Sequence, residues 1–199
     1  MSAHLEGKSV VVTGGARGIG RAVATAAAEA GARVVVADYG GAVDRNQAGS
    51  SEAADTVVDE ITAAGGEAVA AAVDVSTMDG GRAVVEAAMD SFGRLDAVVC
   101  SAGITALKYL WDIEEQEWDD VIAVHLKGDF SCAKAAAKVM IPQSSGSLIF
   151  LSSGALNGMP NVTAYATAKA GILGFTWSTA NALGRFGITT NCMVPSAAT

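Results

Sequence analysis

Short segments rich in valine and isoleucine alternate with longer alanine-rich segments along the whole chain, and this alternation limits the possible folds most. The short segments have the length of buried strands and are Ser9–Thr13, Arg33–Ala37, Glu67–Val73, Ala97–Cys100, Ser147–Leu151 and Thr189–Val194. The longer segments have helical spacing of apolar residues and are Ile19–Glu29, Ser51–Ala64, Asp79–Ser91, Glu115–Met140 and Thr163–Leu183. Strands that alternate with helices are parallel and joined by right-handed crossovers. The sequence therefore predicts a doubly wound α/β fold with three αβα layers.

Glycines stand where the predicted helices should end, at Gly31, Gly65, Gly93 and Gly184. The longest irregular stretch, Tyr39–Ser50, interrupts the second crossover. No linker or repeat divides the sequence, so we expect one domain over residues 1–199.

Composition excludes several classes of function. Apolar residues make up 51% and charged residues 17% of the 199, which is typical of a folded domain. The net charge of −8, without a basic stripe, argues against nucleic acid or an anionic membrane as the main partner. No stretch of 18 apolar residues free of charge and glycine predicts a membrane span.

The cysteines and histidines predict neither disulfides nor a metal site. Cys100, Cys132 and Cys192 are odd in number, widely spaced and form no CxxC pair, and His4 and His125 are the only histidines. Residues 1–8 lack the basic and apolar regions of a secretory leader, so a cytoplasmic setting is expected.

A glycine-rich turn joins the first predicted strand to the first predicted helix. It contains Gly14, Arg17, Gly18, Ile19 and Gly20. Glycines here permit positive φ, let backbone amides approach a pyrophosphate and allow close packing of helix on strand. The turn predicts a dinucleotide site, with a tight turn that binds nothing as the alternative.

Acidic residues end the next two strands and bear on the choice of dinucleotide. Asp38 lies about 20 residues beyond the turn, where a carboxylate accepts hydrogen bonds from a ribose diol and repels a 2′-phosphate. Arg17 favours the 2′-phosphate instead, but Asp38 would lie beside the ribose, so NAD is favoured over NADP. Asp74 and Val75 are candidates for the adenine edge, although Asp74 would also suit a helix cap.

Tyr165 and Lys169 lie four residues apart in a predicted helix and share a face. A nearby cation favours the phenolate of a tyrosine, whose ordinary pKa is about 10. Such a pair is often only an exposed surface pair, but Ser152 and Ser153 follow a predicted strand at the edge where ligands bind in such sheets.

Together these motifs resemble the short-chain dehydrogenase/reductase family over essentially the whole chain. The motifs are Thr13-Gly14-x-x-x-Gly18-x-Gly20, Ser101-Ala102-Gly103, Ser153 and Tyr165-x-x-x-Lys169. The resemblance implies a Rossmann-type sheet, a nicotinamide cofactor and hydride transfer between an alcohol and a carbonyl. It implies that Tyr165 is the general acid and base, that Lys169 lowers its pKa and binds the nicotinamide ribose, and that Ser101, Ala102, Gly103 and Pro195 contact the cofactor.

The family serine that orients the substrate matches two residues. Counting from Gly146 along the strand selects Ser153, whereas counting back from Tyr165 selects Ser152. A loop absorbs a deletion more easily than a strand absorbs a one-residue slip, which would exchange its faces. Ser153 is therefore the expected catalytic serine.

The sequence departs from the family pattern at several positions. Cys100 and Ser101 replace two asparagines, and His125 takes the place of an active-site asparagine. We interpret His125 either as a partner of a water relay, since imidazole titrates near neutral pH, or as a packed side chain without such a role. Pro195-Ser196 replaces Pro-Gly, and the family's last strand and substrate-covering lid are expected to be missing.

The resemblance also suggests a substrate. The insert after Asp38 and the segment Val124-His125-Leu126-x-Gly128 look like the dehydrogenase units of multifunctional β-oxidation enzymes, which implies a 3-hydroxyacyl thioester. The alternatives are a generic alcohol, a steroid or a 3-oxoacyl carrier, or a non-catalytic NAD-binding sensor or scaffold. The helices Glu115–Met140 and Thr163–Leu183 resemble those that pair family members into homodimers and homotetramers.

Overall fold

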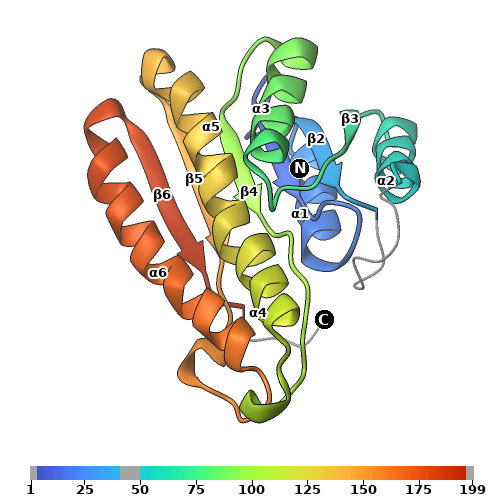
Figure 1. Cartoon of the computed structure of the whole chain (residues 1–199). Coiled ribbons are helices and arrows are strands. Elements are labelled where there is room, and N and C mark those ends of the chain that lie inside the picture. Colours follow the sequence, from blue (N-terminus) through green and yellow to red (C-terminus); the bar gives the residue numbers. More distant parts are fainter. Residues whose placement is uncertain (1–3, 41–49, 196–199) are drawn as a thin grey trace.

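The computed structural model describes residues 4–40 and 50–195 (Figure 1). At its centre, six parallel strands lie in the order β3-β2-β1-β4-β5-β6. The strands are β1 (Ser9–Thr13), β2 (Arg33–Asp38), β3 (Glu67–Ala72), β4 (Ala97–Cys100), β5 (Gly146–Leu151) and β6 (Ile188–Met193). The predicted doubly wound parallel sheet is confirmed.

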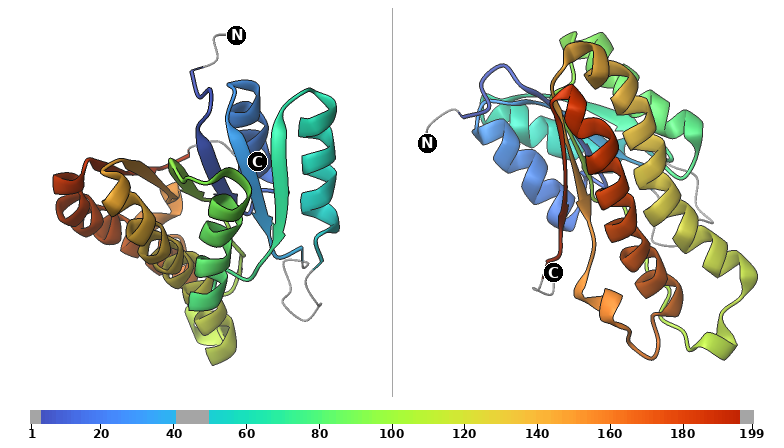
Figure 2. Two further views of the ribbon diagram at one scale, coloured as in Figure 1. Left: turned by 90° about the horizontal axis from the view of Figure 1, so that it is seen from above. Right: turned by 90° about the vertical axis from the view of Figure 1, so that its left-hand side faces the viewer.

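Helices cover both faces of this sheet. The helices are α1 (Gly18–Glu29), α2 (Glu52–Ala63), α3 (Met78–Phe92), α4 (Glu115–Ile122), α5 (Gly128–Gln143) and α6 (Thr163–Leu183), of which α4 packs on α6 and not on the sheet. Figure 2 shows α1 and α2 on one side and α3, α5 and α6 on the other. Successive strand residues serve opposite sides, because Val11 packs in the core under α3 and α5 while Val10 and Val12 pack in the core under α1.

The strand order reverses beside β1. The chain first builds outward through β2 and β3, and then returns to place β4 against the free side of β1. In such sheets the connections on either side of this reversal point separate at the carboxyl ends of the strands and leave a crevice. The fold therefore places the ligand site beside the ends of β1 and β4.

The long helix predicted over Glu115–Met140 is divided. Residues Ala123–Lys127 form a π-helical turn between α4 and α5, in which the Gly128 amide donates to the carbonyl of Ala123. This turn contains one residue more than a regular α-turn, and turns of this kind occur frequently at functional sites. The prediction of one continuous helix was wrong, because the backbone stays right-handed through Ile122 and Gly128 at the two ends of the turn and no proline marks the change.

The predicted glycines lie at all four helix ends, and three of them have left-handed backbone angles. Gly31, Gly65 and Gly93 have φ values of +93°, +88° and +72°, which disfavour any other residue. Gly184 follows the last residue of α6 but stays right-handed at φ −55°, because a short 3₁₀ turn continues to Phe186. The positive φ falls on Gly187 instead. Most of the predicted irregular stretch Tyr39–Ser50 lies outside the described residues.

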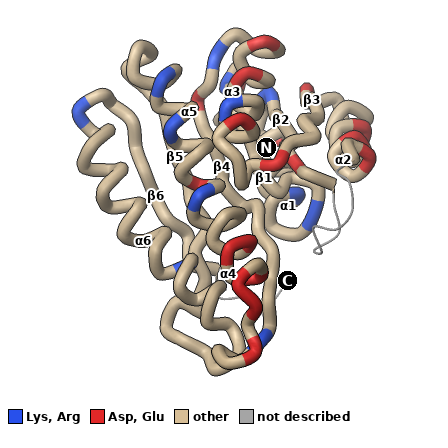
Figure 3. Tube along the Cα trace, viewed as in Figure 1, with Lys and Arg blue, Asp and Glu red and all other residues tan. Residues whose placement is uncertain are grey.

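Among the described residues in the view of Figure 3, charged side chains are distributed without a basic stripe. Figure 3 shows acidic residues on α2 and α4 and basic residues scattered over α1, α3 and α5. Within the ranges 4–40 and 50–195, no helix is long and apolar enough to cross a membrane. The same ranges contain no cluster of three His, Cys, Asp or Glu side chains suited to a metal.

Candidate cofactor and active site

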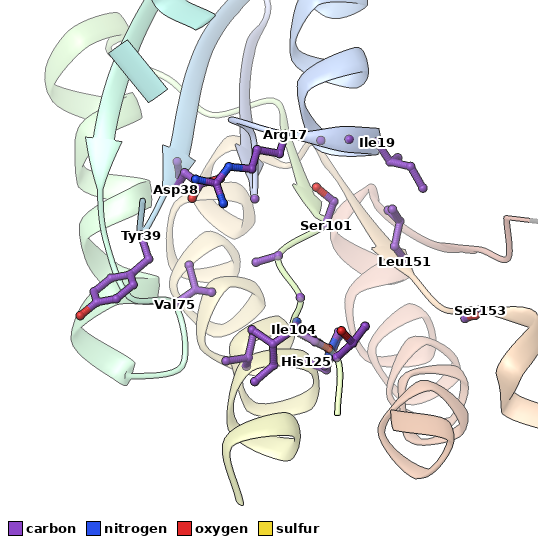
Figure 4. A pocket seen from close by; sticks show the side chains of 18 of the residues that line it. Arg17, Ile19, Asp38, Tyr39, Val75, Ser101, Ile104, His125, Leu151 and Ser153 are labelled. Carbon is purple, nitrogen blue, oxygen red and sulfur yellow. Dashed lines mark hydrogen bonds between the residues drawn. The ribbon is translucent and has the colours of Figure 1, made fainter. Parts of the chain in front are cut away.

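A cleft of about 470 Å³ opens at the carboxyl ends of the strands (Figure 4). Its wall includes every residue that the sequence predicted for the site: Gly14, Arg17, Gly18, Ile19, Gly20, Asp38, Asp74, Val75, Ser101, Ala102, Gly103, Ser153, Tyr165, Lys169 and Pro195. Ser152 and His125 also line it. Residues separated by up to 181 positions therefore meet in one cavity.

The glycine turn is tightly packed at Gly14 and open toward the cleft at Gly18. Gly14 has φ +63°, and a Cβ there would lie 2.7 Å from the Ala102 Cα atom. Gly18 has φ +50° with nothing within 4 Å of an added Cβ, so a side chain there would project into open space at the cleft. No side chain caps the N-terminus of α1, because Arg17 at the cap position makes no such bond.

These features fit a dinucleotide. Uncapped first-turn amides and the positive end of the helix dipole favour a phosphate group, and a glycine in the wall lets the phosphate approach the backbone. The residues present are therefore compatible with a pyrophosphate at the amino end of α1.

The carboxylate of Asp38 ends β2 beside this turn. Its Oδ2 accepts from the Ala16 amide at 3.1 Å and its Oδ1 from the Gly40 amide at 2.9 Å. These bonds fix the carboxylate at the wall of the cleft, and Figure 4 shows the Arg17 side chain extending toward it.

Asp74 plays a different local role from a helix cap. Its Oδ1 accepts from the Ser76 amide at 3.0 Å in a tight turn after β3. The cap of α3 is Thr77, whose Oγ1 accepts from the Gly80 amide at 2.9 Å. The alternative interpretation of Asp74 as the capping acid is thus wrong, and Asp74 lines the cleft.

Ser101 holds the turn after β4 against β1. Its Oγ donates to the carbonyl of Thr13 at 2.5 Å, and the Thr13 hydroxyl accepts from the amides of Ser101 and Ala102 at 3.2 and 3.3 Å. The Ser101 side chain is smaller than the asparagine that the family pattern has at this position. The structure shows a direct bond from Ser101 to the neighbouring strand.

Tyr165 and Lys169 lie at the other wall of the cleft, on α6. The Lys169 side chain is 6% exposed, and its Nζ donates to the carbonyl of Leu151 at 2.5 Å. The same nitrogen lies 5.4 Å from the centre of the Tyr165 ring. Burial lowers the pKa of Lys169, whereas the nearby Asp129 raises it. The alternative of an exposed surface pair is excluded, because the ammonium group is enclosed next to the phenol.

The two candidate serines have different surroundings. Ser152 is 4% exposed, and its Oγ donates to the Lys169 carbonyl at 2.8 Å. Ser153 is half-buried, and its Oγ accepts from the Ala155 amide at 3.2 Å. The Ser152 hydroxyl proton is thus engaged within the protein, while the Ser153 hydroxyl keeps its donor for another group.

His125 is enclosed between the turn after β4 and Tyr165. Its Nε2 lies 2.7 Å from the Ile104 carbonyl oxygen and 3.1 Å from the Ile104 amide nitrogen. The imidazole meets the Tyr165 ring edge-on, with 5.1 Å between ring centres. Burial first, and then the charge of Lys169, lower the pKa of His125 to about 3. The ring is therefore neutral across the physiological range.

Several lining residues escaped the sequence analysis. They are Ala37, Tyr39, Val73, Ile104, Thr105 and Leu151. Each lies within two positions of a predicted site residue, so its closeness to the end of a predicted strand is the only feature of the sequence that could have indicated it. Their side chains carry no distinctive chemistry that would separate them from ordinary loop residues.

A sequence profile described as short chain dehydrogenase matches residues 8–199. The chain belongs to this family. A solved short chain dehydrogenase from Mycobacterium avium has 44% identity and a TM-score of 0.89, over 97% of this chain and 68% of that one. The Rossmann-type fold expected from the resemblance is confirmed by this likeness.

Two curated relatives carry names of reactions. A 3-oxoacyl-(acyl-carrier-protein) reductase, FabG, of Staphylococcus aureus is 43% identical over 94% of this chain and 73% of its own length. The dehydrogenase subunit BbsD of Thauera aromatica, named for a hydroxy(phenyl)methyl-succinyl-CoA, is 34% identical over 96% of this chain and 73% of its own. This short-chain dehydrogenase is thus an oxidoreductase that uses a nicotinamide cofactor, and the prediction of an enzyme is confirmed.

Proposed function

We propose that this enzyme interconverts a 3-hydroxyacyl and a 3-oxoacyl thioester by hydride transfer with NAD. The observation that carries the proposal is the meeting of Tyr165, Lys169 and Ser153 in the same cleft as the glycine turn and Asp38. A phenol with a buried ammonium group beside it suits proton transfer, and the glycine turn suits a dinucleotide phosphate.

The proposed chemistry assigns one task to each side chain. When bound, a nicotinamide cofactor supplies or accepts the hydride. The Ser153 hydroxyl donates to the substrate oxygen and orients it. Tyr165 takes the hydroxyl proton during oxidation and returns it during reduction. Lys169 places its ammonium nitrogen 5.4 Å from the centre of the Tyr165 ring, where its positive charge would stabilise negative charge that develops on the phenol oxygen during proton transfer.

Two relatives support an acyl thioester as the substrate class. The name of one contains an acyl group on a carrier protein and that of the other an acyl group on CoA. One name contains a 3-oxoacyl group, and the other contains an acyl group that carries a hydroxyl. In both relatives, the carbon named as oxidised or reduced thus belongs to the acyl part of a thioester. Generic secondary alcohols and steroids are the competing substrate classes, and neither contains a thioester.

Asp38 supports NAD over NADP. Its carboxylate is fixed at the cleft by the Ala16 and Gly40 amides, where it would accept from a ribose diol and repel a 2′-phosphate. Arg17, directed toward the same corner in Figure 4, would favour the phosphate, but its exposed guanidinium is screened by solvent more strongly.

An absorbance assay at 340 nm tests the reaction and the substrate class together. The panel contains 3-oxoacyl-CoA esters, the same acyl groups on a short pantetheine thiol, and simple ketones without a thioester, each with NADH. We expect kcat/KM for the thioesters to exceed that for the ketones by at least about tenfold, a difference of 1.4 kcal/mol. Equal or greater turnover of the simple ketones would contradict the thioester proposal.

We also propose that two or four copies assemble through α5 and α6. Phe130 on α5 and Trp177 on α6 are 42% and 66% exposed, an unusual state for large apolar side chains that a partner surface would cover. Light scattering of the wild type and of Trp177→Glu tests this, with a multiple of the monomer mass expected only for the wild type. A monomeric wild type would refute the assembly.

A further inference from the structure

Residues 103–108, the cleft segment, follow β4 and form a wall of the cleft without regular structure of their own. Gly103, Ile104 and Thr105 line the cleft, and residues 101–107 belong to no helix or strand. The first anchor of the cleft segment is His125, whose Nε2 lies 2.7 Å from the Ile104 carbonyl oxygen and 3.1 Å from its amide nitrogen (Figure 4). The shape of this wall therefore depends on contacts with neighbouring elements.

Lys108 provides the second anchor. Its backbone pairs with Val162, the residue before α6, in an isolated parallel bridge. Its Nζ lies 2.7 Å from Oε1 and 2.8 Å from Oε2 of Glu117, so both carboxylate oxygens hold the ammonium group. Glu117 Oε2 also accepts from the Glu114 amide at 3.0 Å and so belongs to the capping box of α4. Lys108 thus ties the cleft segment to the first turn of α4 and to the start of α6.

The two tied helices carry the groups next to the proposed acid and base. Tyr165 is the third residue of α6 and follows closely on Val162. Ile104 and Ala106 of the cleft segment pack in one apolar cluster with Tyr165 and with Val121 of α4. A displacement of the cleft segment would therefore change the space beside the Tyr165 ring, where the proposed function places the substrate.

The ion pair is suited to fixing the cleft segment rather than to stabilising the fold. The side chains of Lys108 and Glu117 are 41% and 33% exposed, and the two main apolar clusters contain neither residue. Exposed ion pairs add little to the free energy of unfolding. A contact that restricts a loop, however, lowers the entropy that is lost when a ligand orders the loop. Loss of the pair should thus weaken binding at this wall and leave the fold intact.

The dinucleotide end of the cleft is fixed independently of Lys108. Ser101 donates to the Thr13 carbonyl on β1, and the Asp38 carboxylate accepts from two backbone amides. None of these bonds involves the cleft segment. Substrate binding and dinucleotide binding should therefore respond differently to changes at Lys108.

We propose that Lys108 and Glu117 are positioning residues whose ion pair sets the affinity of the site for the acyl substrate. The inference rests on the proposed function, because it concerns the wall beside the substrate position at Tyr165. Neither side chain touches substrate or cofactor in this account. The pair acts through the cleft segment, which it holds in the conformation that binds the substrate.

Steady-state kinetics at saturating NADH separate substrate affinity from chemistry. Lys108→Met removes the charge and keeps an apolar stem, and Glu117→Gln keeps an oxygen that can cap α4. For each variant we expect KM for a 3-oxoacyl-CoA to rise by at least about threefold, with kcat and the Kd of NADH within about twofold of the wild type. Lys108→Arg keeps the ion pair and should keep KM. Lys138→Met, which removes an exposed lysine of α5 outside the cleft, is the matched control.

The two variants also exclude a general effect of charge. Lys108→Met makes the chain more negative and Glu117→Gln makes it less negative, so attraction of an anionic CoA ester would move KM in opposite directions. Loss of the ion pair should raise KM in both. KM values that move in opposite directions, or that stay unchanged, overturn the inference.

Hydrogen exchange without substrate gives a readout that does not depend on turnover. The amides of residues 104–108 should exchange at least about threefold faster in Lys108→Met and in Glu117→Gln than in the wild type, while those of β1 keep their rates. The melting temperature should fall by less than about 4 °C. Unchanged exchange in both variants also overturns the inference. A wild type without thioester turnover overturns the proposed function instead, and the exchange rates then still decide whether the ion pair fixes the cleft segment.

Discussion

Tyr165 and Lys169 lie one turn apart on α6 but are held in opposite ways. Lys169 is enclosed, with its ammonium group bonded to the Leu151 carbonyl, whereas the half-buried Tyr165 lines the open cleft and packs against His125. The cation is thus fixed by the sheet, and the phenol is left available to a ligand. The positive charge of the site is therefore carried by the enclosed Lys169, and the proton would be exchanged by the accessible phenol of Tyr165.

Tyr165→Phe should abolish turnover while the cofactor still binds. The substitution removes one oxygen and preserves the ring that packs against His125, so the cleft keeps its shape. We expect kcat to fall by about 10²- to 10⁴-fold, the usual contribution of a general acid or base. NADH fluorescence should give a Kd within about twofold of the wild type. Substantial activity in this variant would refute the catalytic assignment of Tyr165.

Two neighbouring alanine substitutions should have different effects. Ser153→Ala removes the hydroxyl whose donor is free for substrate, and we expect kcat/KM to fall by about 10²-fold with little change in melting temperature. Ser152→Ala removes the buried bond to the Lys169 carbonyl, and we expect a loss of stability of about 1 kcal/mol. Steady-state kinetics and denaturant unfolding of both variants measure the difference. A larger loss of turnover in Ser152→Ala, at equal stability, would transfer the catalytic role to Ser152.

Replacing Asp38 should change the choice of cofactor. The Asp38→Asn side chain keeps its size but no longer repels a 2′-phosphate, so we expect the ratio of kcat/KM for NAD to that for NADP to fall by at least about tenfold. Arg17→Ala should shift the same ratio in the opposite direction. A wild-type enzyme that prefers NADP would contradict the role assigned to Asp38.

The buried His125 should make folding stability depend on pH. Its pKa is lowered to about 3 in the folded state from an ordinary value near 6.5, so between these values the unfolded chain binds more protons. The contribution of His125 is therefore complete above pH 6.5 and is lost as the pH falls toward 3. At pH 5 the wild type should lose about 2 kcal/mol relative to pH 7 from this residue.

Denaturant unfolding of the wild type and His125→Asn at both pH values isolates that contribution. The variant has no group that titrates in this window at position 125, so the wild-type loss should exceed the variant loss by about 2 kcal/mol. Equal losses would show that the imidazole is not held neutral. The same pKa argues against protonated His125 as a proton carrier in the water relay considered from the sequence.

The central strands were predictable because β1 and β2 are buried on both faces of the sheet. Continuous apolar runs such as Val10-Val11-Val12 and Val34-Val35-Val36 are typical of buried parallel strands. The predicted ends of all six strands differ from the observed ends by at most one residue. The division of the long helix at Ala123–Lys127 was not predictable. Its residues suit an α-helix equally well, and the π turn packs against α6 and against Ile104 in the segment after β4.

The site was predictable where residue type and spacing carry chemistry. Gly18 and Lys169 belong to motifs whose geometry follows from a strand, a turn and a helix. The burial of Asp129 was not predictable, because an aspartate within a helix is usually exposed to solvent, and only the tertiary packing of α5 encloses it. The likewise enclosed His125 could be aligned by resemblance, but its neutrality depends on that burial.

The π turn makes this stretch sensitive to length rather than to composition. Trp118 and Val121 on α4 pack against Ala164 and Ala168 of α6 upstream of the turn, while α5 packs on the sheet downstream of it. Deleting one residue would restore a regular α-turn and rotate one helix about 100° against the other. Both packing faces cannot then be satisfied together, so evolution can exchange side chains here far more freely than it can add or remove a peptide unit.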